Sequence, residues 1–185
     1  MKKILFICLL GLLFTSFSSN AQNSKKGFSK QEKKEMQKAL EMRLFDEAKE
    51  AIENKSFVLE ADRLVFKYGN SAYVSSSTNF ISVDDDDATV QVAFNVAASG
   101  PNGLGGVTVE GRLSNFNIKY DKKGNMFVTM SISGVGLSAT VALTMRYGNN
   151  TATANINPNF NSNIITLDGN IIPFEKTRTF KGMAL

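Results

Sequence analysis

The chain has 185 residues, with 21 Lys and Arg against 17 Asp and Glu, no histidine and one cysteine, Cys8. Without histidine, neither a Ser-His-Asp triad nor a Cys-His pair can form, and zinc sites, built mainly from Cys and His, are disfavoured. The near balance of charge argues against a basic nucleic-acid face. We therefore expect no enzymatic activity, no cofactor, no bound metal and no nucleic-acid partner.

The first 21 residues have the layout of a bacterial secretory signal peptide. Lys2 and Lys3 form a basic start, an apolar run covers residues 4–14, and a small-x-small triplet ends at Ala21. The apolar run is too short to cross a bilayer as a helix, which takes about 20 residues. We therefore predict cleavage after Ala21 and export to the periplasm or the extracellular space as a soluble protein.

Cys8 lies inside the apolar run, whereas a lipid-modified cysteine follows small residues at the end of such a run. Cleavage would remove it, so we expect no stable membrane anchor and no disulfide. The remaining 164 residues (185 minus 21) would carry a net charge of +2 instead of +4, since Lys2 and Lys3 leave. That length suits one domain with a core of its own. We predict a leader at 22–28 and one domain at 29–185.

An amphipathic helix is predicted at about 29–53. Ser29 and Glu32 form a capping box, in which each side chain bonds the other's backbone N–H. A stripe that packs on the domain's own sheet is the favoured interpretation; the alternative, a helix lying on a membrane surface, would want more basic and fewer acidic residues. The apolar stripe consists of Met36, Leu40, Leu44, Ala48 and Ala51 or Ile52.

After residue 55 the apolar period changes from about 3.6 to 2, which is typical of strands with one buried face. Glycine and asparagine turns separate the segments. No helical pattern lies between them, so the strands should be antiparallel and follow one another in a meander. Eight strands are predicted, at 56–67, 72–82, 88–97, 106–120, 125–133, 137–147, 150–156 and 163–175.

The fold class is therefore mainly β (α+β), with one N-terminal helix. A flat sheet of this width would leave long edges free to pair with other chains. We expect the sheet to curl, either into an open or closed barrel or into a curved sheet that holds the helix in its concavity.

Two local features have both a functional and a plain interpretation. The four aspartates at 84–87 could attract a cation, but consecutive residues of an extended chain point in opposite directions, and a solvated hairpin turn is favoured. The glycine-rich stretch at 99–106 leads into a strand and not into a helix, unlike a phosphate cradle. We expect a loop between two strands there.

Three charged residues lie opposite the apolar alternation: Glu110 and Arg112 on one strand, and Arg146 at the end of another. They are the candidate ligand-binding residues, as a polar lining for an anionic or hydrogen-bonding ligand. The alternative is a wet sheet exterior with a cross-strand ion pair, worth about 0.2–1 kcal/mol.

Four segments occur in an order and spacing that resembles a known family: TNFISV at 78–83, GGVTVEG at 105–111, GNIIPFE at 169–175 and TFKG at 179–182. The chain resembles the domain-of-unknown-function family numbered 4251, small exported proteins of Gram-negative bacteria, over about residues 30–183. The resemblance implies export and one β-rich domain. It implies no reaction and no functional residue.

Three functions remain open. The first is a binding module whose curled sheet holds a small apolar or amphipathic molecule in the cell envelope. The second is a structural or protein-interaction module of the envelope, with the helix filling the concavity and no pocket. The third is an enzyme that uses carboxylates, Ser, Lys or Tyr. What fills the concave face distinguishes the first from the second.

Overall fold

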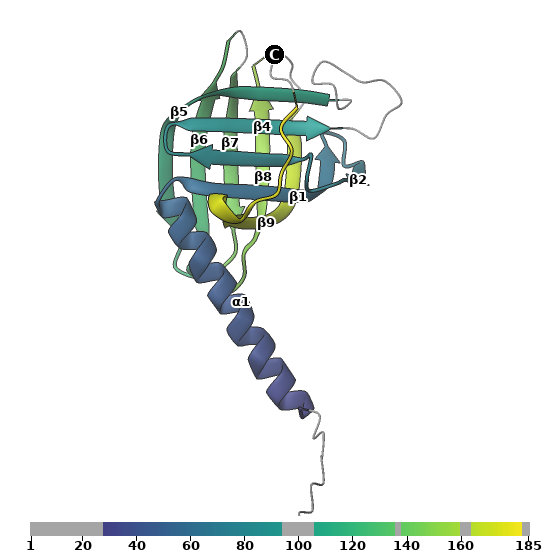
Figure 1. The fold of residues 1–185 in the computed structure, drawn as a ribbon, viewed down its shortest axis with the longest axis vertical. Coiled ribbons are helices and arrows are strands. Elements are labelled where there is room, and N and C mark those ends of the chain that lie inside the picture. The colour runs from purple at the N-terminus through teal and green to yellow at the C-terminus, as the bar shows by residue number, and fades with distance from the viewer. Residues whose placement is uncertain (1–27, 94–105, 136–137, 160–163, 183–185) are drawn as a thin grey trace, which may run out of the picture.

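The computed structural model describes residues 28–93, 106–135, 138–159 and 164–182. Within them, one long helix is followed by nine strands and a short 3-10 helix (Figure 1). The predicted signal peptide, its cleavage site at Ala21, most of the leader and most of the glycine-rich loop lie outside the described residues. The bounds are α1 Lys30–Glu53, β1 Ser56–Phe66, β2 Ser71–Tyr73, β3 Phe80–Asp84, β4 Asp87–Ala93, β5 Gly106–Tyr120, β6 Met126–Ser133, β7 Ser138–Met145, β8 Thr151–Pro158, β9 Ile165–Pro173 and η1 Phe174–Lys176.

The strands form one antiparallel sheet that closes on itself. Neighbours along the chain pair from β3 to β9, and β9 also pairs with β1, from Phe57 opposite Pro173 to Phe66 opposite Ile165. The result is a closed eight-stranded barrel made by β1 and β3 to β9. This confirms the mainly β meander with an N-terminal helix, in its closed form.

The predicted strand at 72–82 is two strands in the structure. The first half of β1 pairs with β3, and Arg63 to Val65 of its second half pair with the three residues of β2. Between β2 and β3 the chain turns at Ser75, whose carbonyl accepts hydrogen bonds from the backbone N–H groups of Thr78 and Asn79. The turn contains neither glycine nor proline, and the sequence interpretation therefore ran the two strands together.

Gly169 lies where the barrel closes. It pairs with Ala61 at a shift in the register between β1 and β9. A Cβ atom built on Gly169 would lie 2.0 Å from the backbone oxygen of Glu60 and 2.7 Å from the Cα of Ala61. Only glycine allows the two backbones to approach this closely.

The helix begins with the predicted capping box. The Ser29 hydroxyl accepts from the N–H of Glu32 at 3.2 Å, and the Ser29 N–H donates to the Glu32 carboxylate at 2.7 Å. The two bonds give hydrogen-bond partners to two backbone N–H groups at the start of the helix. This end of the helix stands free of the barrel (Figure 1).

Only the C-terminal half of α1 packs on the barrel. Phe45, Ala48, Ala51 and Ile52 are buried in the common core, whereas Met36 is 55% exposed. The predicted stripe was therefore wrong in its first half. A spacing of four residues exceeds one helical turn by about 40°, so the apolar positions drift around the helix and away from the barrel.

The C-terminal half of α1 is held by side chains from one strand and one turn. The Phe45 ring meets the Tyr147 ring edge to face, with the centroids 5.1 Å apart. The Tyr120 hydroxyl at the end of β5 donates to the Glu53 carboxylate at 2.5 Å. Burial of the phenol, together with this bond, raises the pKa of Tyr120 to about 12.

Replacement of Gly169 by alanine should destabilise the protein strongly, by about 2 kcal/mol or more, because the added methyl group collides with backbone and not with a movable side chain. The exposed neighbour provides the control, since Asn170→Ala should change the free energy of unfolding by less than about 0.5 kcal/mol. Urea denaturation of the two variants measures both values. Equal stability of the two would contradict the close approach at the seam.

The interaction between Tyr120 and Glu53 should be visible in a titration. Because the folded-state pKa lies above the unfolded value of about 10, the neutral phenol stabilises the fold fully below pH 10 and loses this effect as the pH rises towards 12. The ultraviolet difference titration of the wild type minus Tyr120→Phe should show one phenol with a midpoint near 12. Glu53→Gln should lower that midpoint. A midpoint near 10 in the wild type would refute the interaction.

Candidate functional site

The inside of the barrel is filled by its own apolar side chains. A barrel of eight strands is just wide enough for side chains to fill it. A residue with no exposed area touches no space that could hold a water molecule, so these side chains leave no room for a ligand among them. The largest are at most 1% exposed: Phe57, Leu59, Leu64, Ile81, Met126, Met130, Ile132, Leu143, Met145, Leu167 and Ile171.

One side of the outer surface is covered by the end of the chain. After η1, residues 177–182 run across the outer faces of β1, β3 and β4 (Figure 1). The Phe180 N–H donates to the backbone oxygen of Ser77 at 2.7 Å, and the Thr177 hydroxyl donates to Glu60 at 2.8 Å. We call residues 177–182 the C-terminal segment.

Gln91 of β4 fixes the C-terminal segment from below and is fully buried. Its amide nitrogen donates to the backbone oxygens of Thr78, at 3.1 Å, and Phe180, at 2.8 Å. Its amide oxygen accepts from the Thr108 hydroxyl, at 3.0 Å, and from the Gly182 N–H, at 2.7 Å. All four hydrogen bonds that this amide group can make are therefore used.

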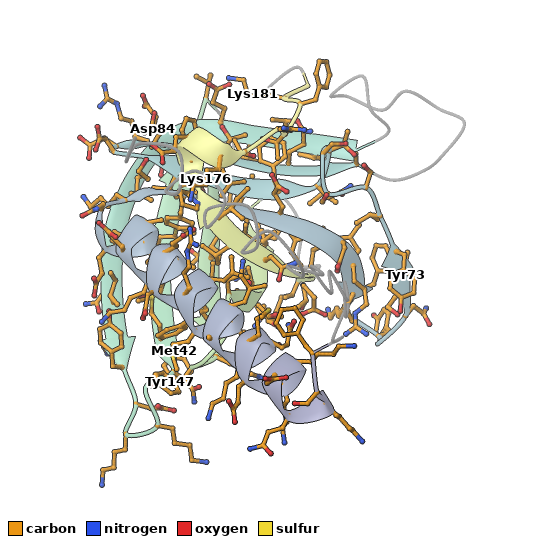
Figure 2. All side chains as sticks on the ribbon, turned by 60° about the horizontal axis from the view of Figure 1, so that its bottom comes forward. Met42, Tyr73, Asp84, Tyr147, Lys176 and Lys181 are labelled. Carbon is orange, nitrogen blue, oxygen red and sulfur yellow. The ribbon has the colours of Figure 1, made fainter. Side chains whose placement is uncertain are left out.

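An open groove of about 350 Å³ lies between α1 and η1. On its helix side, the Glu47 carboxylate accepts from Lys176 at 2.9 Å and from Arg43 at 3.0 Å. Figure 2 shows Lys176 on η1, beside α1. These two bonds, that of Lys176 first, hold the pKa of Glu47 below its usual value. Because the Glu47 carboxylate already has two cationic partners, it is poorly suited to bind a cationic ligand in this groove. The lining consists of Glu47, Glu50, Ala51, Asn54, Ser56, Pro173, Phe174, Glu175 and Lys176.

The structure does not bring the three predicted site residues together. Glu110 lies on the outer face of β5 and forms an exposed ion pair, at 2.8 Å, with Lys181 of the C-terminal segment. Arg112 pairs with Ser133, the last residue of β6. Arg146 follows Met145, which pairs with Met126 at the other end of β6, so the two arginines lie at opposite ends of that strand. None of the three lines the barrel interior, since all are exposed.

The four aspartates form a tight hairpin turn between β3 and β4. Asp84 pairs with Asp87, and Asp85 has a φ of 51°. All four are exposed, as expected for a solvated turn. Within the described ranges, no three His, Cys, Asp or Glu side chains converge in a way that could hold a metal ion.

The other side of the outer surface carries almost no charge. Between Lys123 and Asp168 the sequence contains one charged residue, Arg146, and it follows the end of β7. Hydroxyl and amide side chains cover the strands in this stretch instead. We call the outward side chains of β6, β7 and β8 the neutral face: Phe127, Thr129, Ser131, Ser133, Ser138, Thr140, Ala142, Thr144, Thr151, Thr153, Asn155 and Asn157.

Sequence reasoning missed Gln91 and the neutral face. In β6 and β7 only the apolar residues of the alternation were used for the prediction. The alternating polar residues contain no charge, and this absence of charge was the signal that could have revealed the neutral face. Gln91 looked like an ordinary outward residue because the chain that buries it comes about 90 residues later. No local pattern reveals that cover.

A closed antiparallel barrel with a filled interior and a helix against one end is thus the class of this protein. The model of the domain of unknown function DUF4251 matches residues 31–171. A crystal structure of a DUF4251 family protein from Bacteroides eggerthii DSM 20697 is similar, with 46% identity and a TM-score of 0.68 over 76% of this chain and 94% of that one. The chain belongs to the DUF4251 family, as its sequence segments suggested. No curated protein matches it.

Loss of the Gln91 side chain should release the C-terminal segment. Gln91→Ala removes the four hydrogen bonds that this amide group makes, and we expect it to lower the free energy of unfolding by about 1–3 kcal/mol. Hydrogen exchange at the Gly182 amide should accelerate at the same time. The control is Lys181→Ala, which removes only an exposed ion pair worth about 0–1 kcal/mol. If both variants release the segment equally, Gln91 is not what holds it.

Proposed function

We propose that the protein is an exported, non-enzymatic interaction module of the cell envelope, which binds its partner on the outer surface of a solid barrel. The filled interior is the observation that carries this proposal. Sites for small molecules are hollows of about 300–1,000 Å³. The inward side chains of the described strands are packed too closely to form one inside the barrel, and the groove of about 350 Å³ between α1 and η1 lies outside it.

This observation favours the interaction module over the carrier of a small apolar ligand, which needs space inside the barrel. For the interaction module, the sequence predicted that the helix fills the concavity of the sheet, and the structure differs on this point. The barrel strands supply the filling themselves, and α1 adds Ala48 and Ile52 at one end of the core instead of lying in a concavity.

Three carboxylates with a lowered pKa are engaged in local structure and are not suited to act as catalytic acids. Hydrogen bonds from Ser29, Lys176 and Asn125 hold the pKa values of Glu32, Glu47 and Asp121, respectively, below their usual values. A carboxylic acid that transfers protons near neutral pH needs a raised pKa instead. All three carboxylates take part in local structure at the protein surface.

Export is supported by the basic start, the short apolar run and the triplet that ends at Ala21. The core described above consists of apolar packing and contains no cysteine, so it has the same stability whatever the redox state of the compartment. In the described part of the chain, no helix is both long and apolar enough to cross a membrane.

A native mass spectrum tests the proposal. The full chain is expressed in a Gram-negative host and purified from the envelope fraction without denaturation. We expect the mass of residues 22–185 with no small molecule bound. Ala21→Tyr, which places a bulky residue at the cleavage site, should retain the first 21 residues.

Two outcomes would count against the proposal. One lipid or metabolite molecule bound per protein chain would show that the barrel opens to hold a ligand. A wild-type chain that keeps its first 21 residues would refute the predicted cleavage.

A further inference from the structure

The neutral face differs from an ordinary protein surface in what it lacks. A design target for a soluble protein surface is about 25–35% charged residues, with both signs interspersed. The outward side chains of three neighbouring strands here contain none. The nearest charges on paired strands are at the borders, where Arg112 and Lys119 of β5 lie beside Ser133 and Phe127, and Asp168 of β9 lies beside Thr153.

The register places the polar groups in rows across the strands. One row runs from Thr129 through Ala142 and Asn155 to Thr166. A parallel row joins Ser131, Thr140 and Asn157. Adjacent strands lie about 4.8 Å apart, so hydroxyl and amide groups repeat at short, regular intervals over the face.

Many of these groups have capacity left for an external partner. Within the described ranges, the side chains of Thr129, Thr140 and Thr144 make no hydrogen bond to other protein groups. Each hydroxyl offers one donor and two acceptor positions, and the amide of Asn157 adds two donors and an acceptor. The face therefore offers donors and acceptors together, without charge.

We infer that the neutral face binds a neutral polyhydroxylated polymer, a polysaccharide. This deepens the proposed function and rests on it, because it requires that binding takes place on the outer surface. The hydroxyl groups of such a polymer are themselves neutral donors and acceptors, like the hydroxyl and amide groups of the face. The exposed Phe127 ring adds an apolar surface at the border of the rows.

Other ligand classes fit less well. Over the rows inside the face, away from its borders, a charged polymer would lose its hydration and find no opposite charge, which is unfavourable. Protein interfaces are anchored by aromatic residues and Arg, and the face contains only Phe127 of these. A small free sugar would need a hollow to enclose it. A polymer can instead add many weak contacts along an open surface.

Affinity gel electrophoresis tests the inference. The purified protein is run through gels that contain a neutral polysaccharide (dextran, laminarin or mannan) or an anionic one (heparin or polygalacturonate). We expect at least one neutral polymer to retard the protein and the anionic polymers to leave its mobility unchanged. The double variant Thr129→Lys/Thr140→Lys should bind at least 10-fold more weakly, because bound polymer would bury two unpaired charges.

The matched control is Gln31→Lys/Ser71→Lys, which adds the same charge at exposed positions on α1 and β2, away from the face. It should bind like the wild type. The milder Thr129→Ala/Thr140→Ala/Thr144→Ala removes three hydroxyl groups without adding charge and should weaken binding several-fold. Circular dichroism establishes that each variant is folded.

Three results would overturn the inference: no retardation by any neutral polymer, retardation by the anionic polymers alone, or equal binding by the lysine variant on the face and its control. Analytical sedimentation can give a fourth such result: a wild-type dimer and a monomeric Thr129→Lys/Thr140→Lys variant. The neutral face would then bind a second copy of the chain and not a polysaccharide. In all four cases the proposed surface module would stand. A small molecule found inside the barrel would instead overturn the proposed function.

Discussion

The pairing of β9 with β1 is the constraint on which the rest of the structure depends. It turns a meander into a barrel with a fixed circumference, and so sets the space that inward side chains must fill. It also requires two backbones to approach closely at Gly169. Because both end strands are paired, the barrel has no long open edge at which another chain could extend the sheet.

Closure also explains how a barrel can carry a face without charge. Charged side chains on sheets discourage pairing between molecules, chiefly at exposed edges. Here β6, β7 and β8 are paired on both sides. Their outward residues therefore need not protect an edge, and the sequence can place small hydroxyl and amide groups there.

The two sides of the outer surface differ for a related reason. Over β4, the Gln91 amide and the C-terminal segment satisfy each other, and that side is closed by the chain itself. Over β6 to β8 no described segment lies on the strands, and several hydroxyl groups remain free for solvent or a partner. A module that binds on its surface requires such an uncovered area. Of these two sides, only the one formed by β6 to β8 is free of a described covering segment.

Much of the fold could be predicted because it depends on local patterns. The alternation in β6 and β7 and the capping box at Ser29 lie within short windows, and each was correct. The errors arise where distant residues decide. The turn at Ser75 is stabilised by Asn79, whose side chain accepts from the Ala93 N–H on another strand. The helical stripe that starts at Met36 is exposed in its first half because the barrel contacts only the C-terminal half of α1.

The candidate site was harder to predict than the fold, and the reason is physical. Charged residues attract attention in a sequence, but on a barrel exterior a charge such as that of Glu110 finds a solvent-exposed partner and contributes little. Polar groups without charge carry no such signal one at a time. They become a surface only when strand pairing brings Thr129, Ala142 and Asn155 into one row, and that row does not exist until the register is known. For a barrel whose interior is filled, the information about binding therefore lies in the register of its outward residues.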